Sequence, residues 1–151
     1  MSAQMTVSFR QARDSHYAER LIHQNMAAYY AKLQIRWDSA SFERNWSAFE
    51  NYEICVNGQA VDVLCLSHDD VACYIRDLHV EPAWQGRGLG TEAVHYATGI
   101  AKESGIRTLR LRVFEGNPAV SLYERLGFRI VKSEDDTHYM QWMLSPQVVP
   151  E

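Results

Sequence analysis

Three glycines stand at alternate positions in residues 85–91, which read QGRGLGT. Residues 71–80 before them have the composition of a strand, and residues 91–104 after them carry apolar side chains at helical spacing. A glycine-rich turn between a strand and a helix lets an anion approach the backbone amides at the helix N-terminus. The segment therefore predicts a mixed α/β fold with a phosphate-binding loop, to which Arg87 adds positive charge. A simple surface turn is the alternative.

Two common phosphate-binding motifs do not fit this loop. A Walker P-loop requires GxxxxGK[ST], and that string does not occur in the sequence. A dinucleotide fingerprint requires GxGxxG, whereas here the glycines are spaced G-x-G-x-G and Thr91 occupies the last position. The loop therefore predicts a di- or polyphosphate ligand other than a nucleoside triphosphate or a nicotinamide dinucleotide.

The rest of the chain predicts the element order β-α-α-β-β-β-α-β-α-β-β, which is typical of a mixed α/β domain. Asn57-Gly58 between two apolar runs predicts a hairpin. Ser41 is the expected N-cap of the second helix, and Asn117-Pro118 the expected start of the last one. Strands are expected at residues 6–10, 52–56, 60–66, 71–80, 108–114, 128–132 and 138–144, and helices at 15–32, from 41, at 91–104 and at 117–126.

The composition bounds the class of protein. The 151 residues suggest a single domain over 1–151, and the net charge of −4 with interspersed signs argues against a nucleic-acid partner. No apolar run approaches the ~20 residues of a membrane span, and the first residues do not resemble a signal peptide, so we expect a cytoplasmic protein without a membrane partner. Cys55, Cys65 and Cys73 have no metal-site spacing and are expected to be buried thiols.

Two segments together resemble the GNAT superfamily of N-acetyltransferases: LHVEPAWQGRGLGTEAV and, further along, NPAVSLYERLGF. The resemblance is close over residues 74–128. The family's Q/R-x-x-G-x-G/A pattern is met by Gln85, Gly88 and Gly90. Its second pattern is met by Asn117, Ala119, Tyr123, Gly127 and Phe128, although the alanine follows the asparagine by two positions rather than three.

The resemblance implies a mostly antiparallel central sheet that splays between its fourth and fifth strands, flanked by helices. It implies acetyl-CoA as donor, coenzyme A as product and no metal. The pyrophosphate would be held by the amides after Gln85, and a backbone N–H of the preceding strand end would polarise the thioester carbonyl. The residues implied to bind acetyl-CoA are Leu78, His79, Val80, Gln85, Gly86, Arg87, Gly88, Leu89, Gly90, Thr91 and Asn117.

The catalytic residues follow the family only in part. Tyr123 matches the family's general acid, and a phenol carries its proton at neutral pH. Many relatives have Glu or His as the base at positions that are occupied here by Tyr74 and Arg76, and Arg stays protonated. Asp77 and His79 are the nearby alternatives as base, and they share a strand face if the pleat is regular. Asp77 could instead attract a cationic amine.

The acceptor side of the family lies near the first two helices. In this region Trp37 and Asp38 fall in the expected interhelical loop, and together with Asp77 they are the predicted substrate-binding residues. The leading hypothesis is direct acetyl transfer to a primary amine of a small metabolite. The alternatives are a protein lysine or N-terminal acceptor, or a non-catalytic acyl-CoA sensor. The last hairpin, HYMQWML, carries apolar residues that could form a homodimer.

Overall fold

A computed structural model describes residues 6–145. The chain divides into two compact units. The first holds the chain up to Leu66 together with Asp77–Ala93, and the second holds Ser67–Arg76 and the chain from Val94 onward. The sequence SPQVVPE predicts a loose tail at residues 145–151, and residues 146–151 lie outside the described residues.

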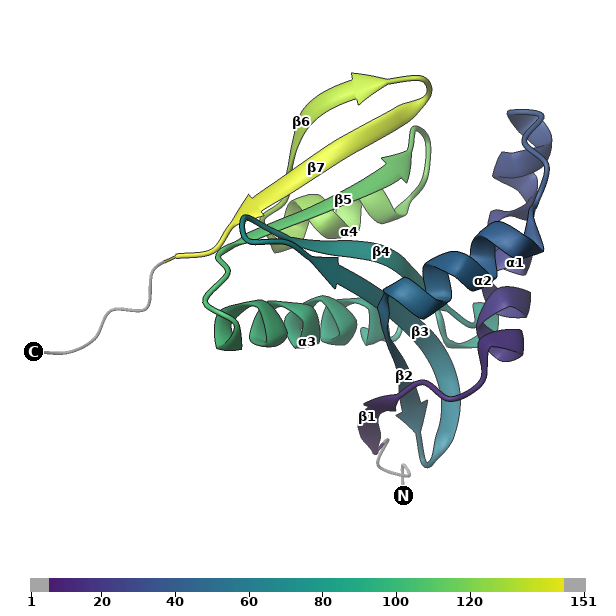
Figure 1. Cartoon of the computed structure of the whole chain (residues 1–151), viewed down its shortest axis with the longest axis horizontal. Coiled ribbons are helices and arrows are strands. Elements are labelled where there is room, and N and C mark those ends of the chain that lie inside the picture. Colours follow the sequence, from purple (N-terminus) through teal and green to yellow (C-terminus); the bar gives the residue numbers. More distant parts are fainter. Residues whose placement is uncertain (1–5, 146–151) are drawn as a thin grey trace, which may run out of the picture. The chain divides into compact units, whose positions relative to one another are not determined.

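Seven strands, four α-helices and one short 3₁₀ helix make up the described chain. The strands form one sheet in the hydrogen-bonded order β1-β2-β3-β4-β5-β7-β6, and Figure 1 labels these elements. In chain order they are β1 (Val7–Gln11), α1 (Ser15–Lys32), α2 (Ser39–Ala48), β2 (Glu50–Val56), β3 (Gln59–His68), β4 (Cys73–Val80), η1 (Pro82–Trp84), α3 (Leu89–Glu103), β5 (Thr108–Phe114), α4 (Ala119–Leu126), β6 (Arg129–Glu134) and β7 (Thr137–Met143).

The predicted order of elements and the mixed α/β class are confirmed. The hairpin between β2 and β3 turns at Asn57 (φ 51°) and Gly58 (φ 83°), the two positive φ values that a tight two-residue turn requires. Pro118 directly precedes α4, and Asn117 before it accepts the N–H of Ala119, the first residue of the helix, on its Oδ1 at 2.9 Å, so the Asn117-Pro118 pair stands at the helix start as predicted. The predicted cap of α2 was wrong: Asp38, not Ser41, accepts the first amides of that helix.

The strand pairs β1–β2, β2–β3, β5–β7 and β6–β7 are antiparallel, whereas β4 and β5 pair in parallel. Their parallel register joins Cys73–Ile75 to Leu109–Leu111. Both strands run on past this register, β4 to Val80 and β5 to Phe114. The splay that the family resemblance implies beyond these residues stays a prediction.

The first unit has its core between α1 and β3. Ala18, Leu21 and Ile22 of α1 pack with Val63 and Cys65 of β3, and all five are almost fully buried. Phe42 and Trp46 of α2 and Phe49, which follows the helix, pack against this cluster and are themselves half-buried. The helix pair α1–α2 is therefore anchored to β3 by apolar burial, the dominant favourable term in folding.

The second unit packs α4 and the β5–β7 strands around aromatic rings. Phe128, 1% exposed, lies with its ring centroid 5.7 Å from that of Tyr123 and 5.5 Å from that of Trp142. Gly127, which ends α4, has φ 128°, and a Cβ built on it would lie 2.6 Å from Trp142 Nε1. Only glycine therefore fits between the end of α4 and this indole ring.

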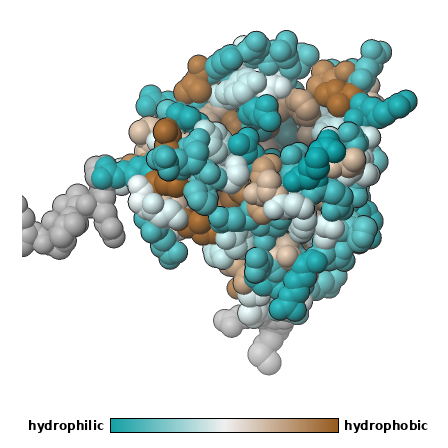
Figure 2. Space-filling model, in the orientation of Figure 1, coloured by the Kyte–Doolittle hydropathy of each residue, from teal (hydrophilic) through white to brown (hydrophobic). Residues whose placement is uncertain are grey.

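The surface of the protein in Figure 2 is mainly hydrophilic, and its three cysteines are buried. Hydrophilic residues predominate on the face shown in Figure 2, where hydrophobic residues form small separate patches. Cys55, Cys65 and Cys73 are buried and free, as predicted. Within residues 6–145, no helix combines the length and the apolar composition needed to cross a membrane.

One buried carboxyl group was not predicted. Asp62 on β3 is 0% exposed, and neither carboxyl oxygen has a hydrogen-bond partner. Burial raises the pKa of Asp62 to about 8. In an unfolded chain an aspartate ionises near pH 4. Between about pH 4 and pH 8 the native state therefore holds a proton that the unfolded state has lost, so the free energy of unfolding falls as the pH rises through this window.

Asp62→Asn is expected to flatten this pH dependence, because asparagine has nearly the same shape and is neutral throughout. The variant should gain stability over the parent as pH rises from about 5 to 8, by about 1–3 kcal/mol, the scale of an uncompensated buried polar group. Urea unfolding at several pH values measures the difference. The exposed Asp70→Asn is the control. Parallel pH profiles for Asp62→Asn and the parent would contradict the assignment.

Gly127→Ala is expected to lower the free energy of unfolding by about 2 kcal/mol, because the new methyl group meets Trp142 and the positive φ disfavours a side chain. Gly99→Ala in α3 is the matched control. A Cβ at Gly99 meets nothing within 4 Å, and alanine is the better helix former. In thermal and urea unfolding, the free energy of unfolding should fall for Gly127→Ala and rise for Gly99→Ala. Equal shifts for the two variants would refute the packing argument.

Candidate functional site

The backbone of the glycine loop is not covered by side chains at Gly86 and Gly88. Gly86 and Gly88 have φ values of 76° and 85°, which only glycine adopts readily. A Cβ built on either residue would meet nothing within 4 Å. Both residues are exposed, whereas Leu89, the first residue of α3, is buried. The loop thus presents backbone without side-chain cover, which is the surface that a phosphate group needs for close approach.

The start of α3 supplies unpaired amides to the same surface. The helix begins with the N–H of Glu92 donating to the carbonyl of Gly88 at 3.1 Å. The preceding amides of Leu89, Gly90 and Thr91 belong to the first turn, where N–H groups have no intrahelical acceptor and the helix dipole is positive. These residues fit a pyrophosphate, as the family resemblance implies.

Two amide side chains hold the end of β4 against this loop. Gln85 Nε2 and Asn25 Nδ2 each donate to the carbonyl oxygen of Val80 at 3.1 Å. The guanidinium of Arg87 lies 4.8 Å from the ring centroid of Trp84, so a cation–π contact positions its charge beside the loop. The loop is therefore tied both to β4 and to η1.

Asp77 and His79 lie on one face of β4, as a regular pleat predicts. His79 Nε2 is 3.6 Å from Asp77 Oδ1. Asn25 Nδ2 lies 3.5 Å from His79 Nδ1. The two ring nitrogens of His79 thus face Asn25 on one side and Asp77 on the other.

A cavity of about 310 Å³ brings together the three predicted substrate-binding residues. Trp37, Asp38 and Asp77 all line it. The other lining residues come mainly from α1, α2 and the segment between them: Ile22, Met26, Tyr30, Ile35, Arg36, Ser41, Phe42, Asn45, Trp46, Phe49 and Cys65. The cavity is mostly aromatic and apolar with a few charged groups, which is the usual composition of a small-molecule site.

The negative charge of Asp77 acts on groups inside this cavity. Burial raises the pKa of Tyr30, and the Asp77 carboxylate raises it further. The pKa of Cys65 is raised well above its ordinary value, first by burial and then by Asp77. The thiol of Cys65 therefore stays protonated and is a poor nucleophile. The Asp77 carboxylate thus contributes to the raised pKa of both Tyr30 and Cys65.

Trp37 and Asp38 also have structural partners. Trp37 Nε1 donates to Glu19 Oε2 at 2.9 Å, and its ring stacks on His23 with the centroids 4.8 Å apart. Asp38 Oδ1 accepts the amides of Ala40 and Ser41, and hydrogen bonds to Ser41 lower the pKa of Asp38. Asp38 thus lines the cavity while capping α2.

The family's usual base positions are occupied by a cationic cluster in the second unit. Arg76 Nε donates to Ser67 Oγ at 2.8 Å, and its guanidinium lies 4.4 Å from the ring centroid of Tyr74. Arg110 Nη1 donates to the Tyr74 hydroxyl at 3.3 Å. The Tyr74 hydroxyl in turn donates to Asp69 Oδ2 at 3.1 Å. Arg76 stays protonated and cannot act as a base.

The predicted general acid, Tyr123, lies on α4 in the second unit. It is 7% exposed and packs edge-on against Phe128. Asn117, at the start of α4, has its side chain engaged with the N–H of Ala119. Leu78, His79, Val80 and the loop residues belong to the first unit, whereas Tyr123 and Asn117 belong to the second.

Sequence reasoning did not single out Asn25 or Arg36. Asn25 contacts the end of β4 across more than 50 positions of sequence, and no local spacing signals such a contact. Arg36 precedes the predicted Trp37-Asp38 pair, so its place in the cavity lining could have been anticipated from that neighbourhood. Both belong to the first unit.

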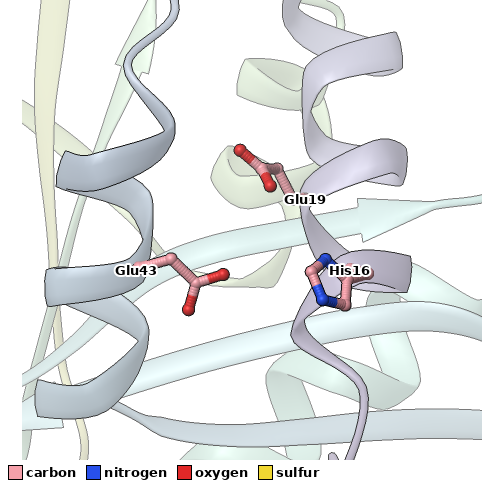
Figure 3. Close-up of side chains that lie close together, drawn as sticks. All are labelled: His16, Glu19 and Glu43. Carbon is pink, nitrogen blue, oxygen red and sulfur yellow. The ribbon is translucent and has the colours of Figure 1, made fainter.

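A separate group, His16, Glu19 and Glu43, joins α1 to α2 (Figure 3). Its ligand atoms all lie within 4.8 Å of one another, so it has the residue types of a cation site. Glu19 also accepts from Trp37, and Glu43 Oε1 accepts from Ser15 Oγ at 3.3 Å. His16 and Glu43 are exposed, and such groups are common without an ion. We therefore assign no ion to this group.

The sequence matches the model of the acetyltransferase (GNAT) family over residues 9–128. Among curated proteins, it is 32% identical over 66 residues to the thialysine N-epsilon-acetyltransferase of Sus scrofa. That match covers 43% of this chain and 39% of the relative. The protein of the same name from Mus musculus is 32% identical over 71 residues, again 39% of its length. The matches thus span about two-fifths of these relatives.

Solved structures share the fold over nearly the whole chain. The PaiA N-acetyltransferase of Thermoplasma acidophilum, in complex with coenzyme A, has a TM-score of 0.75 at 16% identity, with 92% of this chain and 99% of that one covered. A GNAT family acetyltransferase from Elizabethkingia anophelis with acetyl-CoA bound has a TM-score of 0.72 at 15% identity, covering 93% and 98%. At this identity the similarity establishes the fold alone.

Proposed function

Because the chain belongs to the acetyltransferase (GNAT) family, we propose that it transfers an acetyl group from acetyl-CoA to a primary amine of a small molecule. One observation carries the acceptor half of the proposal: Asp77 lines an aromatic cavity of about 310 Å³ together with Trp37 and Asp38. The open glycine loop before α3 supports the donor half, as do the similar structures that contain coenzyme A or acetyl-CoA.

On the donor side, the bared backbone of the loop is suited to the pyrophosphate. The amides from Gly86 to Thr91 are the proposed ligands, with Arg87 as the nearby positive charge. Acetyl-CoA supplies a thioester carbonyl carbon, which the amine attacks. A backbone N–H among Leu78, His79 and Val80 is the proposed donor to the carbonyl oxygen, where negative charge develops. Such a fixed donor is worth roughly 3 kcal/mol of barrier.

On the acceptor side, we assign the proton acceptor to Asp77. His79 has Asn25 at Nδ1 and Asp77 facing Nε2, so its ring orients the carboxylate rather than competing for the proton. Asp77 accepts a proton from the amine, directly or through a water, as the amine nitrogen forms its bond to the acetyl carbon. Trp37 is the proposed wall beside the amine, and Asp38 adds negative charge to the cavity.

The carbon–sulfur bond breaks as the amide forms, and the leaving thiolate takes up a proton. We assign this proton to Tyr123, on its match to the family motif and its protonated phenol. Asn117 is the proposed contact to acetyl-CoA at the start of the same helix. The proton lost by the amine and the proton gained by the thiol balance the reaction.

Two other functions are outcomes of the same test. A protein lysine or N-terminal acceptor would have to reach Asp77, which is only 29% exposed in a cavity with aromatic walls, and this favours a small acceptor. A non-catalytic sensor would bind acetyl-CoA and release no coenzyme A with any amine.

Location and assembly stay predictions. The cytoplasmic assignment rests on the sequence alone. For the homodimer, the β6–β7 hairpin exposes Ile130 (41%), Val131 (62%) and Met143 (60%), and exposed apolar groups on an edge hairpin favour self-association. Sedimentation of the purified protein over a range of concentrations tests the dimer.

In a screen of primary amines with acetyl-CoA, we expect the parent protein to release coenzyme A and form stoichiometric N-acetylated product. Asp77→Asn should lower kcat by about 10²–10⁴-fold, the usual scale for a lost general base. Asp70→Asn, the same change at an exposed residue, should match the parent. Acetyl-CoA binding with no product from any amine would favour the sensor. Equal turnover by Asp77→Asn would remove Asp77 from the chemistry.

Tyr123→Phe should lower turnover by about tenfold or more, because the phenyl ring fills the same space without a proton to donate. Binding of acetyl-CoA and the melting temperature should change little, since the packing against Phe128 is kept. Steady-state kinetics and calorimetric binding measure the two quantities separately. Undiminished turnover would exclude Tyr123 as the acid, whereas weakened acetyl-CoA binding would indicate a binding role instead.

A further inference from the structure

Arg36 is a cationic residue in the lining of the acceptor cavity. It lies in the segment between α1 and α2 and is exposed. Within the described part of the chain its guanidinium forms no hydrogen bond or ion pair. Arg44 of α2, by contrast, donates to Ser41 Oγ at 2.8 Å. The charge of Arg36 is therefore available to a ligand at the rim of the cavity.

Asp77 is a carboxylate in the same lining, at greater depth. Its side chain is 29% exposed, and its charge raises the pKa of the fully buried Cys65. Among residues 6–145 it has no Lys or Arg partner, and its one ion-pair contact is His79 at 3.6 Å. Besides Asp38, the cavity thus carries a positive charge at the rim, Arg36, and a carboxylate inside, Asp77, and these two form no ion pair with one another within the described residues.

Aromatic side chains make up much of the remaining wall. The ring centroids of Tyr30 and Trp37 are 5.6 Å apart, and those of Trp37 and Phe42 are 6.1 Å apart. Such a wall suits a methylene chain, and its ring faces attract an ammonium group. Asp38 also lines the cavity, but its carboxylate oxygens accept hydrogen bonds from the first turn of α2.

We propose that Arg36 determines acceptor specificity and that the acceptor is an ω-amino carboxylate, whose amine meets Asp77 while its carboxylate meets Arg36. The proposal rests on the proposed acetyl-transfer function and names its substrate class. A guanidinium recognises a carboxylate by paired hydrogen bonds. The apolar chain between the two charged ends would lie along the aromatic wall.

The same arrangement disfavours two neighbouring classes. A diamine would bring a second ammonium group to Arg36, where like charges repel. An α-amino acid without a side-chain amine carries its amine and carboxylate on one carbon, so it has no chain between the two charged ends to lie along the aromatic wall. The proposal therefore separates three kinds of amine that share the reacting group.

The test compares acceptors that differ mainly at the far end of the chain. ε-Aminocaproate, hexylamine and cadaverine are assayed with acetyl-CoA on the parent and on Arg36→Gln, Arg36→Lys and Lys32→Gln. We expect kcat/KM for ε-aminocaproate to exceed that for hexylamine by about fivefold to thirtyfold, the scale of one charge-assisted contact. Arg36→Gln should abolish this preference by raising KM at constant kcat, and Arg36→Lys should keep part of it.

The controls separate this proposal from the general function. Lys32→Gln removes the same charge four positions earlier, outside the cavity lining, and should keep the parent's preference. Melting curves verify that each variant is folded. No turnover with any amine would refute the acetyl-transfer function. Turnover that is equal or better with hexylamine or cadaverine would overturn the substrate class alone. A carboxylate preference that survives Arg36→Gln would overturn the role of Arg36.

Discussion

The positions of the glycine loop and of Asp77 in the first unit depend on the hydrogen bonds to the carbonyl oxygen of Val80. It accepts hydrogen bonds from Asn25 on α1 and from Gln85 at the start of the glycine loop, both at 3.1 Å. These two bonds fix where β4 ends, and so where the loop leaves the strand. They also hold Asn25 beside His79, which in turn faces Asp77. Donor loop and acceptor carboxylate are thus positioned by one shared strand end.

Asp62 on β3 and Asp77 on β4 differ in burial, and this difference separates a neutral core residue from a residue that lines a cavity. Asp62 is fully buried without a partner, so its pKa rises and it favours the neutral form. Asp77 is partly exposed, faces His79 and opens into a cavity, where a charged carboxylate can meet an amine. A carboxyl group in a cavity with aromatic walls is the kind of polar group that orients a small-molecule ligand.

Much of the fold could be predicted from local patterns. Helix α1 begins and ends at the predicted residues, and the Asn57-Gly58 turn forms as its φ values require. The cap of α2 was misassigned because Asp38 and Ser41 are both good caps, and spacing alone does not choose between them. Trp37, Asp38 and Asp77 were predicted individually, but their meeting in one cavity depends on how α1 and α2 pack on β3. Asn25 contacts the end of β4 across 55 positions of sequence, which local spacing does not encode. Arg36, by contrast, directly precedes the predicted Trp37-Asp38 pair.

The central claim is that the cavity lined by Asp77 receives the acceptor amine. A crystal structure of the protein with coenzyme A and ε-aminocaproate tests it most directly. The account predicts the amine nitrogen within hydrogen-bond distance of the Asp77 carboxylate, with the pyrophosphate on the amides between Gly86 and Thr91. An amine bound elsewhere while Asp77 remains without a ligand contact would contradict it.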